Sequence, residues 1–261
     1  MKVLWRKGTL PKEWQLAEGC FVPKGENSEG LSEFRTISLL SVECKMYFSL
    51  QSKRVVKYLI GNQYIDTSVQ KGGIAGMSGC LEHTAVISQL IKEAKEGKSS
   101  LAVIWLDLAN AYGSVPHSLV EDTLKAYHVP GKVRDIIQEY YRGLHLRFNV
   151  DNYTTGWQRL EKGIPTGCTI SVILFAAAMN LIMKAAEKEC RGPKMKSGIR
   201  QPPGRAFMDD MTITTEAEAG ARWILKGLEK LIKWARMSFK PRKSRSLVIK
   251  KVRLATQASL R

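Results

Sequence analysis

Residues 205–215 read RAFMDDMTITT and place two adjacent carboxylates, Asp209 and Asp210, between two short apolar segments. In the second segment Met211 and Ile213 alternate with threonines, a pattern typical of a strand with one buried face. We therefore predict a hairpin with strands at about 205–208 and 211–215 that carries both aspartates at its tip. Asp-Asp is also common in ordinary turns, because aspartate bonds to nearby backbone groups, and taken alone this structural explanation is the more frequent one.

A second apolar segment, LAVIWLD at 101–107, ends on another carboxylate, Asp107. An aspartate that closes a buried strand has no solvent to stabilise its charge, so it is costly unless it is paired or bound to a metal ion. Asp209 and Asp210 add to the cost, because neighbouring carboxylates repel each other. Divalent cations relieve both problems, and hard oxygen ligands suit Mg²⁺ or Mn²⁺. A pair of such ions serves in-line phosphoryl transfer.

The composition indicates a polyanionic partner. Among 261 residues, 41 Lys and Arg against 24 Asp and Glu give a formal net charge of +17, which favours nucleic acid over a merely solubilising surface. The five cysteines and four histidines lack ligand spacing, which argues against a disulfide framework or a zinc site. We expect neither a signal peptide nor a membrane span, because the longest apolar run, 172–183, is interrupted by Asn180 and too short to cross a bilayer. It predicts a buried helix.

Periodicity and turn residues predict mixed helices and strands without a regular βαβ alternation, which indicates the α+β class. Glycine-rich residues 71–79 lack the Gly-Lys-Ser/Thr of a phosphate loop, so we expect a mobile loop there. Trp223 and Trp234 share the helical spacing of the last amphipathic helix. The predicted strands are 21–24, 34–40, 101–107, 146–150, 153–160, 205–208, 211–215 and 246–249, and the predicted helices are 42–60, 81–96, 117–127, 132–142, 171–188 and 217–237.

Five sequence blocks, taken in this order, resemble the reverse transcriptase domain of non-LTR (LINE-like) retrotransposons. Each block alone is weak, but five collinear blocks over about 14–252 form a specific pattern. The blocks are Lys24 with FRTISLL at 34–40 (fingers), DLANAYGSVPH at 107–117 (first palm motif), GIPTGCTIS at 163–171 (second), FMDD at 207–210 (third) and the basic turn with Lys243 (fourth). The resemblance implies an RNA-directed DNA polymerase, a nucleotidyltransferase that adds deoxynucleoside triphosphates to a primer 3′-hydroxyl.

The same resemblance implies the fold. We expect a right-hand polymerase core with a palm sheet backed by helices. The fingers would comprise about 14–85 and 118–160, the palm about 86–117 and 161–252, and a tail would follow at 253–261. Few residues follow the fourth motif, so we expect the thumb to be largely absent. We also expect no endonuclease to precede the domain, as in a truncated part of a retroelement.

By the resemblance, Asp107, Asp209 and Asp210 hold two Mg²⁺ or Mn²⁺ ions, with the Leu108 carbonyl as a further ligand. One ion would lower the pKa of the primer 3′-hydroxyl, and the other would hold the triphosphate and the leaving pyrophosphate. Lys243 would donate a proton to the pyrophosphate. A contact to a backbone phosphate is the alternative for a lysine in a basic turn.

Substrate contacts are implied for Lys24, Arg35, Tyr112, Thr166 and Gly167. Lys24 and Arg35 would reach the triphosphate, although as isolated charges they could equally be solvated surface residues. Tyr112 would lie beneath the incoming sugar and exclude a 2′-hydroxyl, and a packing tyrosine is the competing interpretation.

The chain departs from the family pattern outside the three carboxylates, so the metal site looks intact while template and nucleotide contacts are less secure. The expected partners are an RNA template, a DNA primer and deoxynucleoside triphosphates, in the nucleus or cytoplasm. A basic nucleic-acid-binding remnant with little turnover and a templated polymerase of another family are the alternatives. The departures are Thr36 and Val172 for proline, Gly113 for an acidic residue, Thr166 for glutamine and Lys240 for asparagine.

Overall fold

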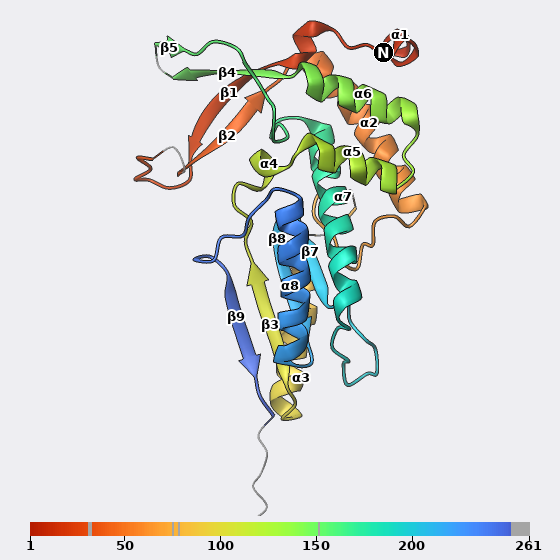
Figure 1. Ribbon diagram of the computed structural model, residues 1–261, viewed down its shortest axis with the longest axis vertical. Helices are drawn as coiled ribbons and strands as arrows, with labels where there is room; N and C mark the ends of the chain where they lie inside the picture. Colours follow the sequence, from red (N-terminus) through yellow and green to blue (C-terminus); the bar gives the residue numbers. More distant parts are fainter. Residues whose placement is uncertain (31–32, 75, 78, 151, 252–261) are drawn as a thin grey trace, which may run out of the picture.

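The computed structural model describes residues 1–251 apart from 31–32, 75, 78 and 151, so the predicted tail at 253–261 lies outside the described residues. Two β-sheets and the helices around them form the fold (Figure 1). The lower sheet in this view carries the predicted FMDD hairpin, and the upper sheet carries the FRTISLL segment. The combination of packed helices with sheets whose strand pairs are mostly antiparallel confirms the α+β class.

The lower sheet has four strands in the order β7-β8-β3-β9, and all neighbours are antiparallel. Its strands are β3 (Leu101–Leu106), β7 (Gly204–Phe207), β8 (Asp210–Thr215) and β9 (Arg245–Ile249).

Helices cover both faces of this sheet, and the alternation along β3 shows which side chains each face receives. Leu106 belongs to the large core cluster, which includes Ile224 and Leu228 of α8 (Glu218–Trp234). Val103 instead packs with Leu90 of α3 (Leu81–Glu96) in a smaller cluster on the other face. Residues of β3 with even numbers therefore point toward α8, and those with odd numbers point toward the α3 side.

The upper sheet is built on β1 (Leu16–Pro23), which pairs antiparallel with β2 (Phe34–Leu39) and parallel with β4 (His145–Val150). Two short strands, β5 (Tyr153–Thr154) and β6 (Gln158–Arg159), pair with β4 and replace the continuous strand predicted at 153–160. The interruption has a local cause, because the Thr155 backbone and hydroxyl both bond to Phe148 and bend the chain.

Apart from η3, which follows α7 and contacts α8 beside the lower sheet, the remaining helices surround the upper sheet and the junction between the sheets (Figure 1). The longest of them, α2, begins at Ser41, whose hydroxyl accepts the Cys44 N–H. Its neighbours α5 and α6 are separated at Pro130, as the sequence predicts. The bounds are α1 (Lys2–Lys7), η1 (Lys12–Gln15), α2 (Val42–Gly61), α4 (Ala111–Ser114), α5 (His117–Ala126), α6 (Gly131–Gly143) and η3 (Glu187–Glu189).

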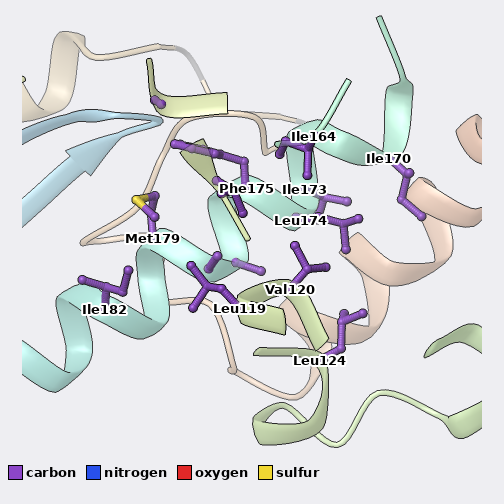
Figure 2. Close-up of a cluster of buried hydrophobic side chains, with 14 of the residues drawn as sticks. Leu119, Val120, Leu124, Ile164, Ile170, Ile173, Leu174, Phe175, Met179 and Ile182 are labelled. Carbon is purple, nitrogen blue, oxygen red and sulfur yellow. The ribbon is translucent and has the colours of Figure 1, made fainter. Parts of the chain in front are cut away.

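The core centres on α7 (Thr169–Ala186), and Figure 2 shows its apolar side chains packed against those of α5. The predicted buried helix is confirmed, and Asn180 is satisfied within it by the Tyr64 carbonyl and the Tyr127 hydroxyl. The argument from length was wrong, because the helical stretch Thr169–Glu189 is long and apolar enough to cross a membrane. Its most apolar window is 72% buried inside the protein, as in the core helix of a folded domain.

The sequence-based interpretation of α8 needs one correction. Its buried residues are Ala221, Ile224, Leu228 and Ile232, which follow a regular helical spacing. Trp223 and Trp234 lie on the opposite side and are 60% and 58% exposed. Hydrophobic spacing alone did not distinguish these two exposed tryptophans from the buried residues of the helix.

Candidate active site

The predicted hairpin is present: β7 ends at Phe207, and β8 begins at Asp210. Phe207 pairs with Asp210, so Met208 and Asp209 form a two-residue turn. Met208 has φ 57°, in the left-handed region that glycine favours in such turns. A non-glycine residue is held there at a cost on the order of 1 kcal/mol, which the surrounding structure must offset.

The strand register brings Asp107 next to this turn. The last printed pair between β3 and β8 is Leu106 with Met211, and the register continued by one residue sets Asp107 opposite Asp210. Antiparallel partners lie about 4.5–5.5 Å apart at their Cα atoms and point to the same face of the sheet. The two carboxylates, far apart in sequence, therefore share one face, opposite to that of Leu106 and Met211.

The electrostatics of Asp210 show that the three carboxylates influence one another. Partial burial raises the pKa of Asp210, and the charges of Asp209 and Asp107 raise it further. Asp210 is nevertheless exposed, and the other two are half-buried. The expectation that these aspartates have no solvent is thus wrong: the strand behind Asp107 is buried, but the carboxylates themselves open to water.

The donor atoms fit a hard divalent cation, although they do not form a closed cage. Within the described ranges, no group of three or more His, Cys, Asp or Glu side chains is close enough to hold a metal ion. Carboxylate oxygens beside open solvent, where waters can complete the shell, are nonetheless the donor set that suits Mg²⁺.

The backbone of Leu108, next to Asp107, pairs with Phe239 in a short antiparallel contact. Leu108 and Phe239 form an antiparallel bridge whose two hydrogen bonds use flanking groups, from Ala109 N–H to the Ser238 carbonyl and from Lys240 N–H to the Asp107 carbonyl. In such a pair the central residue's own carbonyl points away from its partner. For Leu108 that direction is toward β8 and its turn.

A residue that sequence reasoning missed, Gln70, holds the turn in place. Its fully buried side chain accepts the N–H groups of Met208 and Gly72 through Oε1 and donates to the Met208 carbonyl through Nε2. Backbone bonds from Ala206 N–H to the Val69 carbonyl and from Lys71 N–H to the Ala206 carbonyl fix the same segment on β7. The signal was a polar residue at the edge of the glycine-rich segment, but its partner could not be read from sequence.

The first glycines of that segment pack directly against the turn. A Cβ on Gly72 would lie 2.2 Å from the Met208 backbone nitrogen, and one on Gly73 would lie 2.5 Å from the Val172 side chain. Only glycine permits this approach. The prediction of a mobile loop at 71–79 is therefore wrong for residues 71–73, which are fixed on the aspartate hairpin.

Tyr112 lies beside the carboxylates. Burial raises the pKa of its hydroxyl, and the charge of Asp209 raises it further. The ring stacks on Phe175 of α7 at 4.7 Å between centroids with an interplanar angle of 6°. Tyr112 is half-buried, so the packing role and a role toward a substrate are both compatible with its position.

The first and second predicted motifs are joined by backbone hydrogen bonds. Ile164 N–H donates to the Tyr112 carbonyl and Gly163 N–H donates to the Val115 carbonyl, both at 2.9 Å. Gly163 has φ 93°, and a Cβ there would lie 3.0 Å from the Gly113 backbone. At Gly113, one of the departures, an added Cβ would lie 2.4 Å from the side-chain nitrogen of Asn110, so the glycine leaves room for Asn110.

Comparison with known proteins identifies the family that shares this arrangement. Residues 22–256 match the family model described as reverse transcriptase (RNA-dependent DNA polymerase). The chain belongs to the reverse transcriptase family. The expectation of a reverse transcriptase domain from a non-LTR retrotransposon is confirmed, and with it the polymerase fold.

The relatives of this reverse transcriptase domain include Pol polyproteins of retrotransposable elements. It is 26% identical over 223 residues to the retrovirus-related Pol polyprotein from type-2 element R2DM of Drosophila melanogaster, covering 85% of this chain and 20% of that protein. It is 25% identical to the type-1 element R2 polyprotein of Nasonia vitripennis, covering 93% of this chain and 23% of that protein. The chain thus spans about a fifth of the length of these relatives.

Solved structures of telomerase share the fold. Apo telomerase from Candida tropicalis, truncated from its C-terminal domain, aligns with a TM-score of 0.65 at 11% identity, over 92% of this chain and 51% of that one. Telomerase in complex with a fragment of telomeric RNA aligns equally well, at 9% identity over 92% of this chain and 42% of that one. Reverse transcriptases act on a nucleic-acid template and generally use divalent metal ions.

Within the reverse transcriptase domain, the second motif also reaches the upper sheet. The Thr166 hydroxyl donates to the Thr36 carbonyl at 2.6 Å, so two of the departures contact each other. A Cβ on Gly167 would lie 1.8 Å from the Ser38 carbonyl oxygen, which gives this glycine a packing reason of its own. Substrate contacts by Thr166 and Gly167 stay predictions.

The structure places Lys24 and Arg35 in the upper sheet, apart from the lower sheet with the aspartates. Arg35 pairs with Val22 across the β1–β2 hairpin, and Lys24 N–H bonds to the Glu33 carbonyl just beyond the strands. Both are exposed. Residues paired across two strands share a face of the sheet, and so do residues two apart along a strand. Arg35 is paired with Val22, and Lys24 follows Val22 by two residues, so Lys24 and Arg35 lie on the same side of this hairpin.

Lys243 lies in a tight turn that starts beside Asp107. The turn is formed by hydrogen bonds from the Lys243 and Ser244 N–H groups to the Lys240 carbonyl, both at 3.1 Å. Lys240 itself bonds to the Asp107 carbonyl, so the departure at this position keeps its backbone contact. The Lys243 side chain is exposed.

Proposed function

We propose that Asp107, Asp209 and Asp210 bind two divalent cations, Mg²⁺ or Mn²⁺, and that the domain extends a DNA primer on an RNA template. The observation that carries the proposal is the register of β3 and β8, which sets Asp107 opposite Asp210 beside the Asp209 turn. When bound, the ions supply a lowered pKa for the primer 3′-hydroxyl and neutralise charge on the triphosphate.

The chain's own groups would then bind and orient the reactants. The Leu108 carbonyl would add an oxygen ligand, and Lys243 would deliver a proton toward the leaving pyrophosphate. Lys24 and Arg35 would hold the phosphates of the deoxynucleoside triphosphate, where fixed positive charge counters the charge that develops on the leaving group.

The remaining contacts would select the nucleotide. Tyr112, supported from behind by Phe175, would present a flat wall to the incoming sugar. Thr166 and Gly167 would contact the substrate next to β2, because they lie against the backbone of that strand. We assign the upper sheet with α2, α5 and α6 to the fingers and the lower sheet to the palm, within about 14–252.

Primer extension with the purified protein tests this proposal. The substrates are one DNA primer annealed to an RNA or a DNA template of the same sequence, with Mg²⁺ or Mn²⁺, and Asp209→Asn reports contaminating polymerase. Extension on RNA that requires the metal and disappears in Asp209→Asn is the expected result. Binding without extension on either template would identify a nucleic-acid-binding remnant, and extension on DNA alone would identify another polymerase class.

The expected compartment follows from the same function. A reverse transcriptase domain that copies the RNA of a retroelement works inside the cell, and we place it in the nucleus or the cytoplasm.

A further inference from the structure

The outer face of α8 carries two exposed tryptophans in one row with two lysines. Trp223, Lys226, Lys230 and Trp234 are spaced by three and four residues, so they follow one side of the helix. The buried residues of α8 occupy the other side. We call these four residues the outer row.

The exposure of both tryptophans needs an explanation beyond core packing. Trp223 and Trp234 are each more than half exposed, at 60% and 58%. Indole rings are usually largely buried, and an exposed aromatic pair marks an interaction surface more often than a solvated one. Removing either ring from solvent would bring a favourable contribution that the described fold does not already use.

The charges around the outer row select the kind of partner. In the described part of the chain, neither Lys226, Lys230 nor Lys233 forms an ion pair, and Lys226 lies over the Trp223 ring at 5.8 Å. The ion pairs of this helix involve Glu218, which contacts Arg222 and Lys250. Between Trp223 and Trp234 the helix carries three lysines and one acidic residue, Glu229, so the net charge beside the tryptophans is positive, which complements a polyanion and not an ordinary apolar peptide.

The two rings lie about 16 Å apart along the helix axis, given eleven residues at 1.5 Å each. That span corresponds to roughly five nucleotides at the 3.4 Å spacing of stacked bases in one strand. Aromatic rings with flanking cations are the combination that binds single strands, because every base can stack and every phosphate carries charge. We propose that the outer row binds single-stranded nucleic acid, with Trp223 and Trp234 stacking on bases and the lysines contacting phosphates.

This surface is distinct from the carboxylate site. α8 covers the sheet face that carries Leu106 and Met211, whereas Asp107 and Asp210 belong to the opposite face by alternation along their strands. A strand on α8 therefore leaves the carboxylates accessible, and the outer row would hold a flanking segment while another part of the nucleic acid is copied.

Binding of a labelled 12-nucleotide RNA by fluorescence anisotropy tests the proposal. A saturating unlabelled blunt RNA–DNA hybrid occupies the carboxylate site, so that the anisotropy of the labelled RNA reports binding elsewhere on the protein. We expect the double variant Trp223→Ala/Trp234→Ala to bind the RNA at least about tenfold more weakly, since stacking contributes about 1–3 kcal/mol per base. The double Trp→Phe variant retains aromatic faces and should keep most of the affinity.

The lysines are tested by salt dependence with a matched control. Lys226→Gln/Lys230→Gln should lower the slope of log affinity against log salt by about 1.4, at roughly 0.7 per phosphate contact on a single strand. Lys92→Gln/Lys95→Gln removes the same charge from exposed positions on α3 and should leave the slope unchanged. A DNA oligonucleotide of the same sequence shows whether the surface distinguishes the 2′-hydroxyl.

The outcomes separate this proposal from the catalytic one. Extension of a saturating, pre-annealed primer-template should be unchanged in the tryptophan variants, whereas Asp209→Asn should lose extension and keep outer-row binding. Unchanged RNA affinity in Trp223→Ala/Trp234→Ala would overturn the proposal. A loss of self-association in that variant, without loss of RNA affinity, would assign the face to a second copy of the chain.

Discussion

Two antiparallel hairpins carry four of the charged residues assigned to nucleotide transfer, Asp209 and Asp210 on one and Lys24 and Arg35 on the other, and the rest of the chain holds the two hairpins differently. In the β7–β8 hairpin, β8 lies between two other strands, and Gln70 grips the turn from outside. In the β1–β2 hairpin, β2 lies at the edge of its sheet, and the cations at its open end are exposed. Each hairpin has one edge strand, β7 or β2, but residues 69–71 are hydrogen bonded to β7 and its turn, whereas the open end of the β1–β2 hairpin is exposed. We call the first the fixed hairpin and the second the exposed hairpin.

The difference matches what each set of charges has to do. Carboxylates that share small, strongly hydrated cations need fixed positions, because such ions demand near-ideal geometry. Lysine and arginine reach a triphosphate through long side chains, so a less constrained support is sufficient. The Thr166 hydroxyl of the second motif donates to the Thr36 carbonyl of β2, so this motif contacts the β1–β2 hairpin.

The largest effect should come from the fixed hairpin. Asp209→Asn keeps the size of the side chain but removes a charge from the proposed ion site, and we expect primer extension to fall on the order of a thousandfold, about 4 kcal/mol. Asp122→Asn, at an exposed position on α5, is the matched control and should retain activity. Activity within tenfold of the parent in Asp209→Asn would contradict the assignment.

The support behind the hairpin can be broken without touching a carboxylate. In Gly72→Ala the added Cβ would lie 2.2 Å from the Met208 nitrogen, so the turn must shift. A displacement of about 1 Å can lower the rate about a hundredfold, and we expect a loss of that order in single-turnover extension. Gly25→Ala has no atoms within 4 Å of the added Cβ and should behave like the parent. Equal rates for the two variants would show that the support is dispensable.

Substitutions of Tyr112 test whether this residue selects the sugar of the incoming nucleotide. Tyr112→Ala should admit ribonucleotides, with discrimination reduced up to about a hundredfold, because the flat wall beside the sugar is removed. Tyr112→Phe keeps the ring and its stacking on Phe175, so discrimination should change little. The measurement is the ratio of ribonucleotide to deoxynucleotide incorporation. If Tyr112→Ala folds and discriminates as well as the parent, the tyrosine is a packing residue.

The exposed hairpin should give the smallest effect. Arg35→Ala removes one charge-assisted contact to the triphosphate, and we expect the KM for deoxynucleotides to rise about tenfold, while Arg35→Lys loses less. Circular dichroism should be unchanged, since the side chain is exposed. An unaltered KM in Arg35→Ala would leave this arginine as a solvated surface residue.

The parts that the sequence predicted are those with a local signal. Alternation in RAFMDDMTITT located the hairpin, and the five collinear motifs located the family. Gln70 was missed because its partners at Met208 are remote in sequence and become neighbours only through the parallel contact of Gln70 with Ala206. The exposure of Trp223 was missed because helical spacing marks a row of residues without saying which side is covered.

The mutual repulsion of the three carboxylates and their access to water also depend on the tertiary structure. The sequence indicates which aspartates belong together, but repulsion among them and access to water depend on the position of each strand end. Burial of the strand before Asp107 did not imply burial of Asp107 itself, because β3 ends at Leu106.

The central claim is that Asp107 belongs to the same ion site as Asp209 and Asp210. Titration with Mn²⁺, followed by the electron paramagnetic resonance signal of the free ion, measures this directly in the parent and in Asp107→Asn, with Asp122→Asn as control. We expect Asp107→Asn to weaken Mn²⁺ binding at least tenfold, because even groups that only support a metal ligand contribute roughly 10- to 100-fold to metal affinity. Mn²⁺ affinity that is the same in the parent and in Asp107→Asn would contradict it.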